Sequence, residues 1–421
     1  MKKINLKGLD MNIYTETLSN GLEIYMLPYE NKKNYFITFA TKYGSEVIEF
    51  TDVSKKTHKP PLGIAHFLEH KMFEEESGED PFSFYAKSGT DCNASTTYDS
   101  TQYMCWGSKN FNKNLEYLLR FVTHPYFTDQ NVKKEKGIIA EEIKMYLDNP
   151  DLKLETRLRE CIYKNHPRRI DIAGSVEEIK KITKEDLYTC YNNFYIPSNM
   201  FIIISGNFDP DIALEIIKNE LDSNDNRKLP KIKKIIEPVK VNKEEDIIKG
   251  NIEIPKVGIG LKIPTKDIKL DSLSLNLYFN MLTSIVFGAS SLFKERVKDK
   301  RIMNDFYIWP EDVDGLKVLY LLASSLKPDE LIEEIIHEFE NIKIDEESFN
   351  RIKKVWIARE IKGIDNIEES VDTLYYEIVK YNKIIPNKID IIKNMKFKVL
   401  KDLIKNIDFS NYSIVKMKTN K

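Results

Sequence analysis

Hydrophobic and polar positions repeat with clear periods along this chain. Apolar residues alternate with polar ones in residues 21–28 and 35–43, which predicts two strands. Apolar residues recur at helical spacing in several other segments, which predicts helices over 63–73, 82–88, 131–147, 153–163 and 184–193. A continuous apolar run at 200–205 predicts a further strand, so strands and helices are mixed in the first half of the chain.

Residues 91–106 are rich in Thr, Ser and Tyr. Thr101, Tyr103 and Cys105 alternate with their neighbours, which predicts a strand. The polar side chains on this segment favour a half-exposed strand or one at the edge of a sheet.

The second half of the chain repeats the first. Residues 127–143 resemble residues 344–361, and the pair Glu142 and Glu360 sets an offset of 218 positions (360 minus 142). The apolar run 200–205 likewise has a counterpart at 412–417. This order of matches predicts a duplicated domain.

A polar, lysine-rich segment with two prolines separates the two copies, and it is predicted to be the linker between domains. The expected organisation is a first domain over 1–223, a linker over 224–245 and a second domain over 246–421.

Charge and cysteine content narrow the class of protein. Charged residues make up 31% of the 421 residues, yet they are interspersed and the net charge is −2, so no nucleic-acid partner is expected. The N-terminus lacks the apolar core of a signal peptide, and no apolar run is long enough to span a membrane. The four cysteines form no C-x-x-C pair, so we expect reduced thiols in a cytoplasmic protein. Cys92 and Cys105 lie near the two ends of segment 91–106, a candidate active-site strand, so a metal role is the weaker alternative.

The candidate chemistry lies in the predicted helix 63–73. His66 and His70 are four positions apart, so they share one helical face and can bind one metal ion. Glu69 adjoins His70, which completes the inverted zinc-peptidase pattern H-x-x-E-H. The alternative is a fortuitous pattern, but with six histidines in the chain it should arise in on the order of one chain in a hundred.

A third candidate ligand lies in the predicted helix 131–147. The apolar positions Ile138, Ile139, Ile143 and Tyr146 follow a helical period. Glu142 falls on or beside this apolar stripe, Glu135 lies seven positions earlier on the same face, and Glu141 is rotated towards solvent. A carboxylate among apolar residues needs a partner, which a zinc ion or a salt bridge would provide.

These residues resemble the insulinase (pitrilysin) family of zinc peptidases, in its short mitochondrial-processing-peptidase-like branch. The resemblance is most specific at 63–73, Glu135, Glu142 and the segment Asn93-Ala94, and it extends over the whole chain. It implies an α+β fold of two homologous domains, each a mostly antiparallel sheet covered by helices, forming half of a clamshell chamber.

The same resemblance assigns the roles of the site residues. It implies that His66, His70 and Glu142 bind Zn²⁺, that Glu69 is the general base, and that Glu135 supports the site. Three protein ligands leave one coordination position for water, as in catalytic zinc sites. The strand near Asn93 and Ala94 would pair with an extended peptide, so the expected substrate is an unfolded peptide or a leader segment.

The second copy lacks the candidate residues of helix 63–73, because the offset of 218 sends His66 to Ser284, Glu69 to Phe287 and His70 to Gly288. The chain departs from the family pattern in one place. Active single-chain relatives carry a substrate-binding Arg and Tyr, which align here with Val297 and Met303; the nearby residues that could replace them are Arg296, Arg301 and Tyr307. The expected assembly is therefore a heterodimer with a homologous zinc-free subunit, as in the bacterial two-subunit enzymes of the family, or else a homodimer.

Two other functions compete with the peptidase. One is a non-catalytic assembly subunit that keeps zinc as a structural ion, although Glu69 has no use at a structural site. The other is a zinc-dependent hydrolase that acts on something other than peptides, which the polar edge strand makes less favourable.

Overall fold

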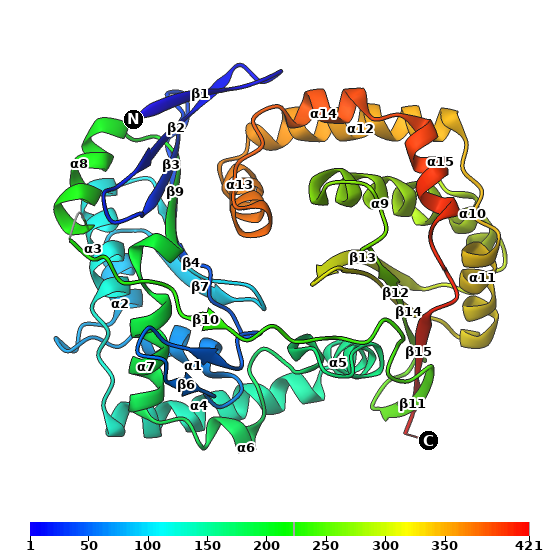
Figure 1. Ribbon diagram of the computed structural model, residues 1–421, viewed down its shortest axis with the longest axis horizontal. Coiled ribbons are helices and arrows are strands. Elements are labelled where there is room, and N and C mark those ends of the chain that lie inside the picture. The colour runs from blue at the N-terminus through cyan, green and yellow to red at the C-terminus, as the bar shows by residue number, and fades with distance from the viewer. Residues whose placement is uncertain (222–223, 421) are drawn as a thin grey trace. The chain divides into compact units, whose positions relative to one another are not determined.

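Two large sheets that share a five-strand arrangement organise the protein, and the computed structural model describes residues 1–221 and 224–420 (Figure 1). The first sheet has the order β1-β2-β3-β9-β4-β8-β7. Its strands are β1 (Lys2–Leu6), β2 (Met11–Thr17), β3 (Glu23–Pro28), β4 (Tyr35–Thr41), β7 (Asp91–Thr96), β8 (Thr101–Gly107) and β9 (Met200–Gly206). A small separate sheet joins β5 (Phe50–Thr51), β6 (Thr57–His58) and β10 (Lys231–Ile232).

The second sheet has the order β11-β15-β12-β14-β13. Its strands are β11 (Glu245–Gly250), β12 (Lys256–Pro264), β13 (Asp305–Val313), β14 (Leu316–Ser324) and β15 (Tyr412–Thr419). They match β3-β9-β4-β8-β7 one for one: β3–β9 and β11–β15 are parallel pairs, and the other neighbouring pairs are antiparallel in both sheets. The predicted α+β fold of two homologous, mostly antiparallel domains is confirmed.

The chain folds into two compact units, each made of discontinuous segments. The first contains Met1–Ile143, Asp171–Lys234 and Glu360–Lys388, and the second contains Lys144–Ile170, Ile235–Arg359 and Ile389–Lys421. The first unit contains the helices α1 (Ile64–Lys71), α2 (Pro81–Lys87), α3 (Phe111–Thr123), most of α4 (Asp129–Asp148), α6 (Val176–Ile179), α7 (Lys184–Phe194), α8 (Pro210–Leu221) and α13 (Ile367–Tyr381). The second contains α5 (Pro150–Ile162), α9 (Ser272–Phe287), α10 (Leu292–Asp299), α11 (Pro328–Glu340), most of α12 (Glu346–Ile364), most of α14 (Lys388–Asn394) and α15 (Phe397–Lys405).

Each half of the sequence supplies one helix to the sheet of the other half. Helix α5 packs on β12 and β15 of the second sheet, as Figure 1 shows, and α13 packs on β4 and β9 of the first. Gly260 makes the α5 contact close, because a Cβ there would lie 2.1 Å from Cδ1 of Ile162. The predicted domains, 1–223 and 246–421 with a linker at 224–245, divide the chain by its sequence duplication, and this division stays a prediction. Position 223, the predicted end of the first domain, lies outside the described residues.

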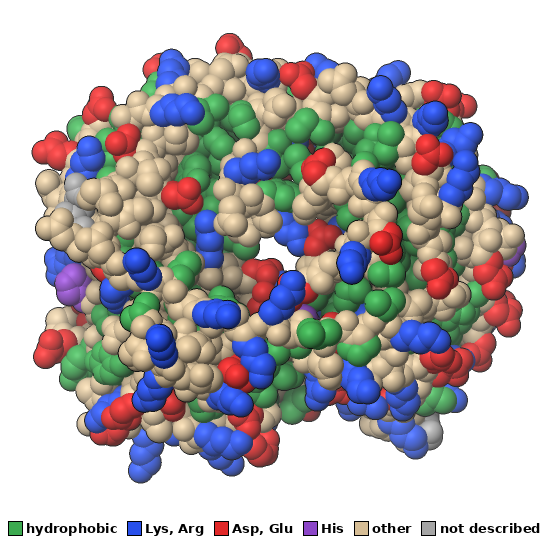
Figure 2. Space-filling model, viewed as in Figure 1, with side chains coloured by type: hydrophobic (Ala, Val, Ile, Leu, Met, Phe, Trp, Pro, Cys, Tyr) green, Lys and Arg blue, Asp and Glu red, His purple; other side chains and the backbone are tan. Residues whose placement is uncertain are grey.

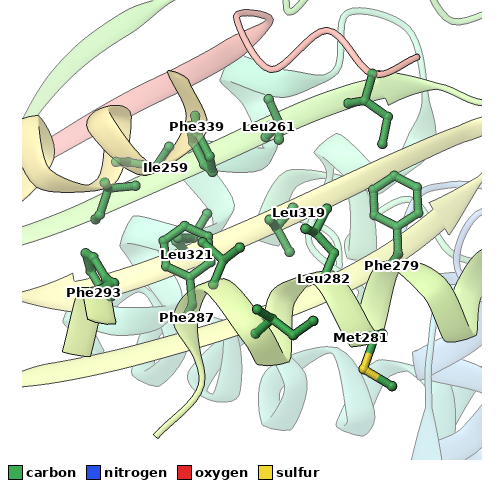
Figure 3. Close-up of a cluster of buried hydrophobic side chains, with 14 of the residues drawn as sticks. Ile259, Leu261, Phe279, Met281, Leu282, Phe287, Phe293, Leu319, Leu321 and Phe339 are labelled. Atoms are coloured by element: carbon green, nitrogen blue, oxygen red, sulfur yellow. The ribbon is translucent and has the colours of Figure 1, made fainter. Parts of the chain in front are cut away.

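Apolar side chains from sheets and helices form the core of each unit. In the second unit, Leu282 and Phe287 of α9 face β14 side chains such as Leu319 and Leu321 (Figure 3). In the first unit, Leu374 and Ile378 of α13 pack against Leu27 and Ile203. The α13 cluster lies on the first sheet, which also contains β7, the strand beside the candidate site.

The segment 91–106 forms two strands where the sequence suggested one. Thr97 makes the turn: its N–H bonds to the carbonyl of Ser100 at 2.8 Å, and its hydroxyl accepts hydrogen bonds from the N–H groups of Asp99 and Ser100. Strand β7 is therefore the sheet edge, and β8 lies between β4 and β7. Cys92 and Cys105 face each other across this pair, and all four cysteines are free thiols.

Positive and negative side chains are interspersed over the face seen in Figure 2, in agreement with the mixed charge pattern of the sequence. Within residues 1–221 and 224–420, no helix is both long and apolar enough to cross a membrane.

Candidate metal centre

Helix α1 carries the first two candidate ligands in a fixed position. Gly63 precedes the helix at φ 85°, and a Cβ on it would lie 2.2 Å from the carbonyl oxygen of Ala173, so the start of the helix requires glycine. Ile64, Phe67 and Leu68 are buried, which anchors one side of the helix in the core. His66 and His70 then lie one turn apart, with ring centroids 4.6 Å from each other.

Helix α4 brings Glu142 to these two imidazoles. Glu142 Oε1 lies 3.7 Å from His66 Nε2, and Oε2 lies 3.4 Å from His70 Nε2. One donor atom from each residue lies within 4.8 Å of the other two. This is the one cluster of potential metal ligands found among the described residues.

The three donors suit a zinc ion. Zinc binds imidazole nitrogen and carboxylate oxygen at about 2.0–2.2 Å, so the ligand atoms of a tetrahedral site lie about 3.3 Å apart. The two distances to Glu142 are close to that separation, and both histidines are at least half-buried. Burial, reinforced by His70, lowers the pKa of His66 to about 4, so this imidazole is neutral at pH 7 and can donate a lone pair.

The buried face of α4 differs from the predicted one at one position. Ile139, Ile143 and Glu135 are buried as expected, whereas Ile138 is 47% exposed. The inclusion of Ile138 in the apolar stripe is therefore wrong, because consecutive residues of a helix lie about 100° apart and only Ile139 faces the core. Glu142 is half-buried at the margin of the stripe, and Glu141 is exposed as predicted.

Glu135 is not one of the three candidate ligands, but it contacts one of them, His70. Its Oε1 lies 3.0 Å from Nδ1 of His70, which leaves Nε2 of His70 facing Glu142. Burial raises the pKa of Glu135, but the His70 hydrogen bond and the charges of His70 and Lys71 outweigh it and hold the pKa below its usual value. A charged Glu135 accepts a hydrogen bond from Nδ1–H and so fixes the tautomer and orientation of His70.

Glu69 points to strand β7. The Thr96 hydroxyl donates to Glu69 Oε2 at 2.5 Å, and Thr101 Oγ1 lies 3.3 Å behind Thr96 Oγ1. The Thr101 hydroxyl is tied to the carbonyl of Tyr43 at 2.9 Å. Burial raises the pKa of Glu69, an effect that the Thr96 hydrogen bond and His70 oppose. The carboxylate is thus held on one oxygen beside the candidate ligands.

Asn93 and Ala94 lie on the edge strand β7, on the same strand as Thr96. Asn93 is exposed, and its Oδ1 accepts from the N–H of Ala94 at 2.9 Å. An edge strand offers its unpaired backbone groups to an extended chain.

Val297 and Met303 align with the substrate-binding Arg and Tyr of active relatives, and they and the possible replacements nearby have different environments. Val297 is fully buried in the core and Met303 packs against it. Arg296 of α10 forms ion pairs with two glutamates of α11, Glu334 at 3.1 Å and Glu338. Tyr307 is 63% exposed on β13, and Arg301 is exposed at φ 53°.

Two residues of the site were not identified from the sequence. Thr96 lies in a segment rich in Thr and Ser, so no sequence pattern distinguishes its hydroxyl from those of its neighbours. Lys71 had a visible signal, because a lysine interrupts the apolar positions of helix 63–73, but only the structure shows that it is fully buried.

Comparisons with known proteins show the family of this chain. A family model described as "Insulinase (Peptidase family M16)" matches residues 54–175, and one described as "Peptidase M16 inactive domain" matches residues 181–355. The chain is 39% identical to the uncharacterized zinc protease YmfH of Bacillus subtilis over 342 residues, which cover 80% of this chain and 79% of YmfH. It is 26% identical to the zinc protease PqqE of Helicobacter pylori, over 85% of this chain and 80% of that protein.

A solved structure has the same fold over its full length. The crystal structure of a putative M16-like peptidase from Alicyclobacillus acidocaldarius matches with a TM-score of 0.91 and 29% identity, covering 99% of this chain and 100% of that one. The chain therefore belongs to the insulinase family of peptidases, peptidase family M16.

Proposed function

We propose that the protein is a zinc metallopeptidase that hydrolyses unfolded peptides or leader segments. The main observation behind the proposal is that donor atoms of His66, His70 and Glu142 lie within 4.8 Å of one another. Glu69 lies on α1, the helix that also holds the two histidines. The names of the relatives as zinc proteases support the same conclusion.

The metal supplies one part of the chemistry. His66, His70 and Glu142 would hold a zinc ion, which would supply Lewis-acid polarisation of the peptide carbonyl and would lower the pKa of a bound water. Glu135 keeps Nδ1 of His70 occupied, so Nε2 remains available as a ligand.

The chain's own residues supply proton transfer and substrate alignment. Glu69 accepts a proton from the attacking water and passes it to the leaving amine, while Thr96 fixes its orientation. An extended substrate adds to the edge strand at Asn93 and Ala94 through backbone hydrogen bonds. Strand addition needs a segment that can take up an extended conformation with free backbone groups, which unfolded and flexible peptides provide.

We also propose that catalysis needs a second, homologous subunit without zinc. The main support is that Val297 is a buried core residue and that Arg296 is already paired with two glutamates. Neither position therefore offers an arginine to a bound peptide. A partner chain would supply a guanidinium whose fixed donors align the peptide carbonyl.

A panel of unstructured peptides tests the proposed reaction. Zinc-dependent cleavage of peptides by the chain with its partner supports the peptidase. A tightly bound zinc without any hydrolysis would point to the assembly subunit, and hydrolysis of non-peptide amides or esters alone would point to another hydrolase.

A further inference from the structure

Lys71, the last residue of α1, is a fully buried lysine beside the candidate metal centre. We propose that Lys71 is a positioning residue for the metal site, which holds Glu135 in the orientation that His70 needs for binding zinc. This inference rests on the proposed function, because it assumes that His70 is a zinc ligand.

The environment of Lys71 is unusual for a lysine. Its side chain has 0% exposure, and Nζ lies 2.7 Å from Glu74 Oε2 and 3.6 Å from Glu135 Oε2. Removing an ammonium ion from water is costly, and a buried ion pair is often no more stabilising than apolar residues of similar volume. The charge of Lys71 instead acts on the carboxylates that it contacts.

Glu135 links Lys71 to the metal centre through its two oxygens. Oε1 lies 3.0 Å from His70 Nδ1, and Oε2 faces Lys71 Nζ. The terminal torsion of a glutamate is broad, so a carboxylate held at one oxygen still rotates. A charge at the second oxygen removes that freedom, keeps Oε1 on Nδ1 and directs Nε2 of His70 towards Glu142, 3.4 Å away.

A second lysine provides a natural contrast. Lys134 Nζ lies 3.4 Å from Glu74 Oε1, so it pairs with the same glutamate as Lys71. Its side chain is 69% exposed, and its ion pair is with Glu74 rather than Glu135. Removing Lys134 therefore changes the local charge by the same amount without removing the contact to Glu135.

The test is the zinc dissociation constant, measured by competition with a chelator on the purified full chain. Lys71→Met should raise this constant about tenfold, and Glu135→Gln by about 10–100-fold, as is usual for groups that orient a metal ligand. Lys134→Met should change it less than about twofold. In the Lys71→Met/Glu135→Gln double variant, the constant should equal that of Glu135→Gln alone, because Lys71 acts through Glu135.

Two results would overturn the inference: a Lys71→Met constant within about twofold of wild type, or effects of Lys71→Met and Glu135→Gln that multiply in the double variant. If Lys71→Met does not fold, Lys71→Gln removes the charge with a smaller change of polarity, and the same outcomes are read on it. Failure of the wild-type chain to bind zinc would instead refute the proposed metal site, so the two failures are distinguishable.

Discussion

The Thr96 hydroxyl donates a 2.5 Å hydrogen bond to Glu69 Oε2, and so joins the edge strand to the proposed general base. Hydrogen bonds to charged groups contribute roughly 1.5–3 kcal/mol. We predict that Thr96→Val lowers kcat by about tenfold or more with little change in KM or zinc content, because only the orientation of Glu69 is lost.

Thr96→Ser is the matched control, since it keeps the hydroxyl and removes a methyl group. It should retain most of the wild-type kcat. Equal kcat values for wild type and Thr96→Val would show that Glu69 needs no such support.

Adjacent glutamates on α4 give a direct test of the ligand set. Glu142→Gln should lose zinc at concentrations where Glu141→Gln keeps one zinc per chain, because Glu142 faces the histidines and Glu141 is exposed. His70→Ala should also lose zinc. Metal analysis of the purified variants measures this, and full occupancy in His70→Ala would disprove the assignment.

The requirement for a partner is tested by reconstitution. The purified chain should bind zinc yet cleave unstructured peptides poorly, and a co-expressed zinc-free relative should raise the rate strongly. A misplacement of about 1 Å costs roughly a hundredfold in rate, so substitution of the partner's arginine should remove most of the gain. High activity of the chain alone would contradict the two-subunit arrangement.

Glu377 on α13 should make stability depend on pH. It is 3% exposed, and burial raises its pKa from 4.5 to about 7, although Lys388 and the N–H of Ile385 oppose the shift. Because the folded state binds the proton more tightly, this stabilisation is complete below about pH 4.5 and is lost as the pH rises through about 7.

Urea unfolding at several pH values measures this effect. Between about pH 5 and pH 8, wild type should lose on the order of 1–3 kcal/mol more unfolding free energy than Glu377→Gln. Parallel pH profiles for the two proteins would mean that Glu377 titrates normally.

The candidate site could be predicted because its ligands lie on two helices with strong local patterns. The spacing of His66 and His70 defines a shared helical face, and Glu142 adjoins the buried positions Ile139 and Ile143. Local periodicity is less informative for single neighbours, because Ile138 fits the helical period of the apolar stripe and yet is exposed.

Other features depend on contacts between distant segments, which no local pattern encodes. The turn at Thr97 divides one Thr/Ser-rich segment into two strands. The exchange of α5 and α13 between the sheets depends on packing such as that of Gly260 against Ile162. The contacts of Lys71 and Thr96 with Glu135 and Glu69 likewise appear only once α1, α4 and β7 are assembled.

The most direct test of the central claim compares wild type with Glu69→Gln, at matched zinc content and with the zinc-free partner present. The amide cannot accept the proton of water, while His66, His70 and Glu142 are unchanged. The account predicts one zinc per chain in both proteins and a peptide-cleavage rate lower by at least about 10²–10⁴-fold in the variant. Cleavage at the wild-type rate by zinc-loaded Glu69→Gln would contradict it.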